Sequence, residues 1–457
     1  MVKSTQQSVL FPGAYSKPIV AKFDADHQSS DGGVILLRRL DDRFGFGLTK
    51  SIAAHLVDDR DPNRVTHPYL DLFRQRAYGI ALGYSDCNDA ERIASDPCLK
   101  LACDRSPIDA DDALGSQPTL SRFENSQTPR SILAISREIE TQVIKRLAKR
   151  RRKAKRITID LDPSVDPAHG QQAFTFFHGF YDTNCYLPLF GFLSIDDEPE
   201  QYLFCARLRP GNARCFRGSI PLLKRVVPEL RRRFPKAKIR VRLDSGFANP
   251  ILFDVLDSLK VEYLVGMPGN SVLNGLAAPD MLLASVCSEL SSQTETFYSD
   301  GKYKARSWKK ERRVIIKSEV VTHPDRTPKN NARFVITNLR TAPKSTYATY
   351  CQRGDAENRI KELKVLDVDR TSCTSFLGNQ LRILMASVAF ILFQELRWVL
   401  RHTKAARSQV GRLQLMLMKI GTRVVESVRR VVLHFSSAHP WQVLWRKAAL
   451  AVGASPT

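Results

Sequence analysis

The chain has 457 residues, more than one hydrophobic core usually supports, and its 43% hydrophobic content is ordinary for a soluble globular protein. Lys and Arg number 70 against 47 Asp and Glu, which gives a formal net charge of +23. This excess runs through most of the chain and favours a polyanionic partner, nucleic acid first, because phosphates release counterions when many cations approach. A basic surface without such a partner is the alternative.

Cysteine usage and hydropathy bear on the compartment. The nine cysteines form no Cys-x-x-Cys pair and lie far from any His at zinc-ligand spacing. We expect reduced, mostly buried thiols in a cytosolic protein. The N-terminus is too polar for a signal peptide, and the longest apolar run, Ile383 to Phe393, is too short to span a bilayer, so no membrane role is expected.

Residues 1–145 predict a helical N-terminal domain, with apolar residues at helical spacing from Tyr69 to Ala81. Within it, the stretch from Ser116 to Glu124 predicts a short helix capped by Thr119, which offers Arg122 to solvent. Such a helix is typical of a helix-turn-helix reader of DNA, and equally of any capped surface helix.

A basic linker over residues 146–156 leads into the first strand of the next domain. Nine Lys or Arg occur among the twelve residues from Lys145 to Arg156, a run that is usually solvated but here lies where a phosphate backbone would pass. In the following Ile-Thr-Ile-Asp-Leu-Asp, the apolar residues share one strand face, and Asp160 and Asp162 share the other. Two carboxylates therefore project together from one strand.

Residues 157–268 predict an α/β core. A later period-two segment points Arg240, Arg242 and Asp244 to one face, with Asp244 at the strand end, where a carboxylate opens into a cleft. The order β-β-β-α-β-α-β is that of an RNase H-like core. After the first strand the predicted elements are strands over Tyr186–Ile195 and Gln201–Leu208, a helix over Ser219–Arg233, a strand over Lys238–Asp244, a helix over Pro250–Ser258 and a strand over Glu262–Met267.

Three further regions follow. Residues 269–341 predict an inserted β-rich subdomain, because strand-like pieces rich in Lys and Arg alternate with polar turns. Its Trp308 is a candidate for stacking on a base, although a Trp among strands more often packs. Residues 342–396 predict the second part of the core. Residues 397–457 predict a helical C-terminal region that either mediates dimer contacts or binds DNA.

One helical stripe in the second part of the core carries four polar residues. At about 100° per residue, Tyr350, Arg353, Glu357 and Lys364 fall within about 60° of one another on a helical wheel. The stripe presents a phenol, a guanidinium, a carboxylate and an ammonium group. Gly354 weakens this helix near its start.

The spacing Tyr-x2-Arg-x3-Glu-x6-Lys resembles the Tyr-Arg-Glu-Lys motif of one branch of the DDE insertion-sequence transposases. The resemblance extends to Asp162-Pro-Ser, which is similar to the family's Asp-x-Thr with Ser164 in place of Thr. It also includes the Arg-Leu-Asp-Ser-Gly-Phe segment at 242–247, and softer similarities at 83–90 and 116–122 bring most of the chain within it.

The resemblance implies a catalytic triad of Asp162, Asp244 and Glu357 on an RNase H-like mixed sheet, holding two Mg²⁺ or Mn²⁺ ions. Two such ions activate the attacking oxygen and stabilise the leaving 3′ oxygen in phosphoryl transfer. The partners implied are double-stranded DNA, namely the terminal inverted repeats of an insertion sequence and the target, with a homodimer in the DNA complex. Asp160 remains an alternative to Asp162 as the first metal ligand.

The family pattern also implies phosphate contacts by Tyr350, Arg353 and Lys364 near the cut end. We add Arg242 and Arg122 as expected DNA contacts, the latter in an N-terminal domain that binds DNA ends. Two other functions stay open: an RNase H-like structure-specific nuclease without strand transfer, and a transposase-derived DNA-binding protein.

Overall fold

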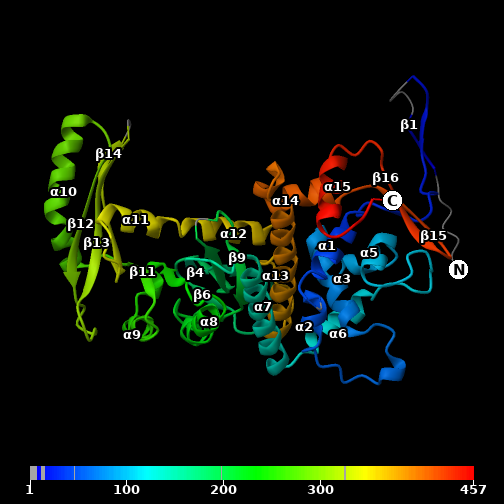
Figure 1. Cartoon of the computed structure of the whole chain (residues 1–457), viewed down its shortest axis with the longest axis horizontal. Coiled ribbons are helices and arrows are strands. Elements are labelled where there is room, and N and C mark those ends of the chain that lie inside the picture. The colour runs from blue at the N-terminus through cyan, green and yellow to red at the C-terminus, as the bar shows by residue number, and fades with distance from the viewer. Residues whose placement is uncertain (1–7, 12–15, 46, 197, 324–325, 457) are drawn as a thin grey trace. The chain divides into compact units, whose positions relative to one another are not determined.

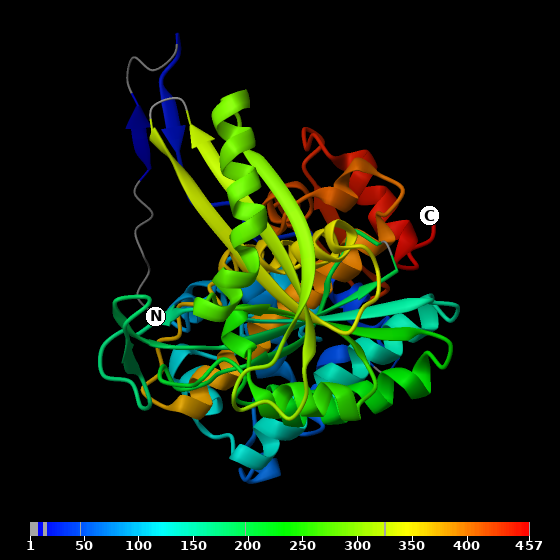
Figure 2. The ribbon, with the colours of Figure 1, turned by 90° about the vertical axis from the view of Figure 1, so that its left-hand side faces the viewer.

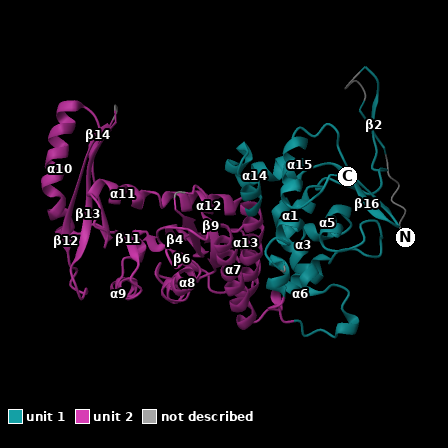
Figure 3. Cartoon of the chain, viewed as in Figure 1, with its two compact units in different colours: residues 1–53, 58–123, 395–457 teal, residues 54–57, 124–394 magenta. Residues whose placement is uncertain are grey.

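The structure, a computed structural model, describes residues 8–11, 16–45, 47–196, 198–323 and 326–456 (Figure 1). The chain forms two compact units, coloured separately in Figure 3. Unit 1 comprises residues 1–53, 58–123 and 395–457, and unit 2 comprises residues 54–57 and 124–394. All nine cysteines are free thiols and five of them are buried, as the sequence predicts.

Unit 2 is built around one mixed sheet of eight strands, in the order β12-β13-β14-β11-β10-β4-β8-β9. Strand β10 lies parallel between β4 and β11, whereas β8 pairs antiparallel with β4, and β9 in turn pairs antiparallel with β8. Parallel neighbours need crossover connections, and the helices α8 and α9 provide them. The elements in chain order are β4 (Arg156–Pro163), β8 (Leu189–Ile195), β9 (Tyr202–Arg207), α8 (Ser219–Arg233), β10 (Lys238–Leu243), α9 (Pro250–Ser258) and β11 (Glu262–Met267). The predicted order β-β-β-α-β-α-β is therefore confirmed, with a small sheet of β5 (Asp166–Pro167), β6 (Phe176–His178) and β7 (Thr183–Tyr186) inserted after β4.

The register between β4 and β10 positions two acidic residues. Leu243 on β10 pairs with Leu161 on β4, in a parallel ladder that begins at Lys238 and Arg156. Because parallel strands end at the same edge of a sheet, the residues that follow this pair, Asp162 and Asp244, lie at one edge.

Residues 269–341 differ from the predicted β-rich insertion in two ways. They begin with a long helix, α10 (Ser271–Ser291), which sequence reasoning missed because Gly275 and Pro279 interrupt the helical pattern. Their strands also do not form a separate sheet, since β14 pairs antiparallel with β11 and so extends the core sheet. Figure 2 shows α10 lying along these long strands, which are β12 (Glu295–Tyr303), β13 (Arg312–His323) and β14 (Arg326–Thr337).

Two long helices are associated with the β9 edge: α7 (Pro129–Arg150) and α13 (Phe376–Val399). The α13 side chains of Gln394 and Gln380 accept hydrogen bonds from the backbone N–H groups of Leu203 in β9 (3.0 Å) and of Leu208 just after it (2.7 Å), which satisfies backbone donors along this edge. By length and composition both α10 and α13 are apolar enough to cross a membrane, but 89% of the apolar window of α13 is buried, as in a core helix. In α10 the corresponding fraction is 22%.

Unit 1 combines the N-terminal helices with the C-terminal segment. The predicted helix from Tyr69 is present as α3, whereas the prediction of an all-helical C-terminal region is wrong over residues 422–435, which form a hairpin rich in β-branched valines. Strand β3 near the N-terminus pairs with this hairpin. The elements are β1 (Val9–Phe11), β2 (Ile19–Ala21), β3 (Gln28–Ser29), α1 (Val34–Asp41), α2 (Leu48–Ala53), α3 (Tyr69–Leu82), α4 (Asp89–Ile93), α5 (Pro97–Ala102), α6 (Gln117–Asn125, ending in unit 2), α14 (Val410–Leu413), β15 (Thr422–Ser427), β16 (Arg430–Phe435) and α15 (Gln442–Ala451).

Candidate active site

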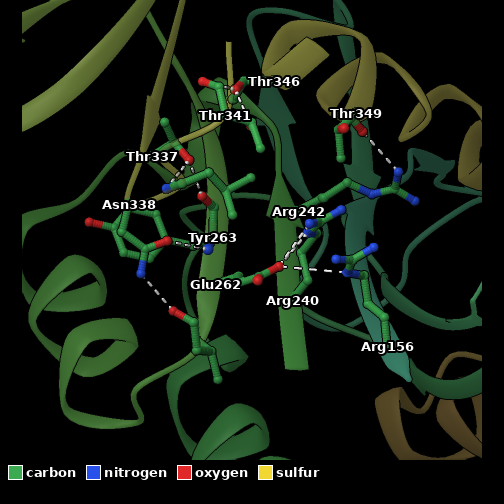
Figure 4. A network of polar contacts seen from close by, with 12 residues as sticks. Arg156, Arg240, Arg242, Glu262, Tyr263, Thr337, Asn338, Thr341, Thr346 and Thr349 are labelled. Atoms are coloured by element: carbon green, nitrogen blue, oxygen red, sulfur yellow. Dashed lines mark hydrogen bonds and ion pairs between the residues drawn. The ribbon is translucent and has the colours of Figure 1, made fainter. Parts of the chain in front are cut away.

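Charged side chains alternate in a regular way along one face of β10. Arg240 donates to Glu262 on β11 at 2.8 Å, and Arg242 forms two 2.7 Å hydrogen bonds to the two carboxylate oxygens of Asp160 on β4 (Arg240, Arg242 and Glu262 are seen in Figure 4). The next position on this face is Asp244, a carboxylate in place of a third arginine. Each arginine on this face of β10 is therefore paired with a carboxylate on a neighbouring strand. At the end of the strand an acidic side chain takes the place of the arginine, so negative charge is in excess there.

We call Asp160 and Arg242 the inner row. Arg242 is 3% exposed, and its remaining donors reach the carbonyl oxygen of Thr349 (3.0 Å; Figure 4) and the side chain of Gln352 (3.1 Å). Both carboxylate oxygens of Asp160 are occupied by the guanidinium. The expected DNA contact by Arg242 does not fit this burial, so we leave Arg242 out of the DNA-binding residues proposed below.

We call Asp162 and Asp244 the outer row. Asp244 caps the short 3-10 turn Ser245–Phe247 by accepting a 2.8 Å hydrogen bond from the N–H of Gly246. Burial raises the pKa of Asp162 to about 7, with the negative charges of Asp244 and Glu357 adding to it and Arg353 opposing it. Burial also raises the pKa of Asp244. Two carboxylates that resist ionisation side by side form a place where a cation is stabilised.

The helix that carries Glu357 is not the single helix that the sequence predicts. Helix α11 (Pro343–Cys351) ends before α12 (Gly354–Lys364) begins, although Figure 1 shows the two nearly in line. The backbone stays helical between them, with the N–H of Arg353 donating to the oxygen of Tyr350 (3.0 Å), so the interruption is a tight turn next to Gly354. Tyr350 therefore belongs to one helix and Glu357 to the next.

Arg353 connects the outer row to α12. Its guanidinium lies 3.2 Å from Asp162 Oδ1 and donates a 2.8 Å hydrogen bond to Glu357 Oε1. The side chain of Glu357 is 50% exposed, whereas Asp162 is buried. One cation thus bridges a strand-end aspartate and the helix glutamate.

Tyr350 approaches the same edge through a glycine in β11. A Cβ atom placed on Gly266 would lie 2.5 Å from Tyr350 Oη and 2.9 Å from the backbone nitrogen of Ser245. Only glycine therefore allows the tyrosine hydroxyl to lie against the backbone next to Asp244. Sequence reasoning missed Gly266, and the available signal was an isolated glycine inside an apolar strand.

The other predicted residues lie away from this group. Lys364 pairs with Asp369 at 2.9 Å, about 10 Å along the axis of α12 from Glu357. Arg122 is exposed on α6, which begins at Gln117, two residues before the expected cap. Trp308 packs in the core with its ring centroid 4.9 Å from that of Phe253 and 5.2 Å from that of Tyr303, which favours its packing interpretation.

The outer row and Glu357 are suitable donors for a divalent cation. Within the part of the chain that the structure describes, no three acidic, His or Cys side chains cluster tightly enough to hold a metal ion as they stand, and Arg353 lies between Asp162 and Glu357. Carboxylate oxygens are nevertheless the hard ligands that Mg²⁺ and Mn²⁺ prefer. Binding of one such ion by all three carboxylates requires Arg353 to leave Asp162.

Comparison with protein families gives a match that covers nearly the whole chain. A family model described as transposase DDE domain group 1 matches residues 11–456, which include both strand-end aspartates and α12. No curated protein matches the sequence.

Proposed function

The chain belongs to the family of DDE transposases, through a transposase DDE domain of group 1 that takes up nearly its whole length, and we propose that it cleaves DNA at the terminal inverted repeats of an insertion sequence and joins the freed ends to target DNA. We further assign it to the Tyr-Arg-Glu-Lys branch and its sheet to the RNase H-like class. The family is that of the transposases, and we propose the catalytic residues, the chemistry and the DNA ends on which this chain acts.

The observation that carries the proposal is the outer row. Asp162, near the end of β4, and Asp244, directly after β10, belong to adjacent parallel strands, and Arg353 bridges Asp162 to Glu357 at 3.2 and 2.8 Å. Three carboxylates from distant parts of the sequence thus share one edge of the sheet. An edge with one bridging arginine and three acids supports the binding of divalent cations.

In the proposed reaction Asp162, Asp244 and Glu357 hold two Mg²⁺ or Mn²⁺ ions. When bound, such ions supply activation of the attacking oxygen and stabilisation of the leaving 3′ oxygen. Arg353 exchanges its carboxylate partners for a DNA phosphate, to which a guanidinium donates two hydrogen bonds. Tyr350, held against Gly266, donates its hydroxyl to a phosphate near the cut, and Lys364 neutralises the backbone further along α12.

The same proposal includes the partners and the compartment. Transposon ends and target are double-stranded DNA, which the formal charge of +23 favours. Arg122 contributes to binding of the ends, and two copies of the chain pair two ends as a homodimer. The protein acts in the bacterial cytoplasm, at the nucleoid.

The test is cleavage of the DNA that flanks the coding region. A fragment with short inverted repeats is incubated with purified protein and Mg²⁺, and cuts are mapped at the repeat ends. We expect Glu357→Gln to abolish cleavage and leave repeat binding intact. The matched control is Asp355→Asn, an exposed acid two residues earlier on α12, which should cut normally.

The outcomes separate the remaining functions. Full activity of Glu357→Gln would sink the mechanism. Cleavage of branched DNA without joining of 3′ ends to a target plasmid would identify a structure-specific nuclease instead. Specific binding of the repeats with no cleavage in either Mg²⁺ or Mn²⁺ would identify a transposase-derived DNA-binding protein.

A further inference from the structure

A cluster of exposed phenylalanines lies in the small sheet inserted after β4. We call residues 174–186, which comprise β6, β7 and the turn between them, the aromatic hairpin. The exposed fractions of its phenylalanines are 58% for Phe174, 41% for Phe176, 60% for Phe177 and 84% for Phe180. Single exposed apolar residues are ordinary, but four phenylalanines within seven positions form a patch that indicates an interaction site.

The aromatic hairpin starts and ends at the catalytic edge of the sheet. The chain leaves β4 after Pro163, one residue beyond Asp162, and returns as β8, in which Phe190 pairs with Asp162 and Leu189 with Pro163. The N–H of Ser164 donates to the oxygen of Pro188 at 3.0 Å, which closes the base of the excursion. Both ends of the segment are therefore fixed beside the first strand-end aspartate.

The turn of the aromatic hairpin lies near the outer row. Burial raises the pKa of Tyr181, and the negative charges of Asp162 and Asp244 raise it further. The rings of Phe180 and His178 have centroids 4.9 and 5.0 Å from that of Tyr181. Phe180, the most exposed phenylalanine of the aromatic hairpin, therefore packs against Tyr181, whose hydroxyl is subject to the negative charges of Asp162 and Asp244.

The loop between β9 and α8, residues 208–218, holds the aromatic hairpin in place. A Cβ atom on Gly211 would lie 2.1 Å from the oxygen of Cys185 and 2.7 Å from that of Phe176, so the loop backbone packs directly against β6 and β7. The buried Arg209 braces this loop by donating to the carbonyl oxygens of Leu187 (2.7 Å) and Cys215 (2.8 Å). The patch is therefore supported by a fixed backbone.

The loop that packs against β6 and β7 also carries two exposed cations. Its side chains of Arg214 and Arg217 are exposed. Aromatic faces next to arginines are the combination that binds single-stranded nucleic acid, since bases stack on the rings and phosphates pair with the cations. An aliphatic protein partner would need no such charge.

We propose that the aromatic hairpin binds unpaired nucleobases of the DNA strand being cut, with Phe177 and Phe180 as the stacking residues and Arg214 and Arg217 on the adjoining phosphates. The inference rests on the proposed function, because the bases concerned are those next to the phosphate at the outer row. Residues 174–186 would then contact the DNA in addition to the three acids and to the polar residues Tyr350, Arg353 and Lys364 of α11 and α12.

The test measures binding in the absence of divalent metal, so that no cleavage occurs. The probes are a duplex with a single-stranded thymidine tail and the same duplex with an abasic tail of equal charge, each followed by fluorescence anisotropy with the full chain. We expect the thymidine tail to bind on the order of tenfold more tightly. The double variant Phe177→Ala/Phe180→Ala should lose this preference and keep its affinity for blunt duplex, whereas Phe180→Trp should retain the preference.

The matched control is Leu290→Ala, which removes a side chain 83% exposed on α10, away from the aromatic hairpin, and should leave the preference unchanged. Equal affinity of the wild-type chain for the two tails would overturn the proposal. An unchanged preference in the double variant would also overturn it. If that variant in addition changes the molecular mass measured by light scattering, the aromatic hairpin is a contact between subunits instead. If the wild-type chain prefers the thymidine tail but shows no Mg²⁺-dependent cleavage, the result counts against the proposed function and not against this proposal, since tail binding is measured without metal.

Discussion

The inner and outer rows lie two residues apart on the same two strands, yet their charges are compensated in opposite ways. In the inner row Asp160 and Arg242 satisfy each other through two 2.7 Å hydrogen bonds and are buried. In the outer row Asp162 and Asp244 are both acids, and Arg353 reaches them from a different element. A buried acid and base that neutralise each other stabilise the packing of the sheet. Two acids with one shared arginine leave negative charge that an added cation can neutralise.

The largest expected effect is on catalysis in the outer row. Asp162→Asn and Asp244→Asn should each reduce metal-dependent cleavage by more than about a hundredfold, since even groups one step removed from a metal cost ten- to a hundredfold. Their melting temperatures should stay the same or rise, because the neutral amide removes the cost of burying a charge. Cleavage assays and scanning calorimetry on the same preparations check both statements, and a lowered melting temperature with normal cleavage would assign the outer row a structural role.

The next effect is on stability in the inner row. Arg242→Met leaves Asp160 buried without its cation and should lower the free energy of unfolding by about 3–5 kcal/mol. The double variant Arg242→Met/Asp160→Leu should recover most of this loss, because neither charge then remains buried. Urea unfolding of the three proteins measures the difference, and equal stability of the two variants would mean that the pair is not the unit described.

Asp166 extends the comparison to a buried carboxylate that accepts a 2.8 Å hydrogen bond from the Thr371 hydroxyl. Burial raises its pKa from 3.8 to about 7. Because the pKa of Asp166 in the folded state lies above its value in the unfolded state, its protonated form favours folding. This contribution to the free energy of unfolding is fully present below about pH 4 and is lost as the pH rises to about 7. Asp166→Asn should remove a few kcal/mol of this pH dependence at most, seen as a flatter melting-temperature profile over that range. Parallel profiles for the two proteins would contradict the assignment.

The smallest expected effect is on stability at the bridging arginine. Arg353→Gln should change the free energy of unfolding by less than about 1 kcal/mol, because Glu357 is half exposed and Asp162 can take up a proton near neutral pH. Urea unfolding at pH 7 tests this against the much larger loss expected for Arg242→Met. A loss of similar size in both variants would erase the distinction between the rows.

The period-two pattern was enough to predict β4 and β10 and to show that Asp160 and Asp162 share a face. It did not separate the two aspartates, because that depends on the pairing of Asp160 with Arg242, which is set by the register of strands about eighty residues apart in sequence. The turn at Arg353 was also missed, since its backbone angles stay helical and only the hydrogen-bond pattern changes. Tertiary contacts, and not local propensity, decide both points.

The aromatic hairpin illustrates a different limit. Its phenylalanines would be read as core residues from sequence, because apolar residues in short strands are usually buried. The structure instead leaves Phe177 and Phe180 exposed, on the segment between β4 and β8 whose two ends are paired next to Asp162. Exposure is a property of the assembled fold, and no local pattern carried it.

The central claim is that the outer row, and not the inner row, receives the metal. Isothermal titration of Mn²⁺ into the wild-type chain, Asp162→Asn and Asp160→Asn, with folded protein verified by circular dichroism, tests it most directly. We predict that Asp160→Asn binds Mn²⁺ with nearly wild-type affinity despite a lower melting temperature, while Asp162→Asn shows no binding. Retained binding in Asp162→Asn together with loss in Asp160→Asn would contradict the assignment and move the metal to the inner row.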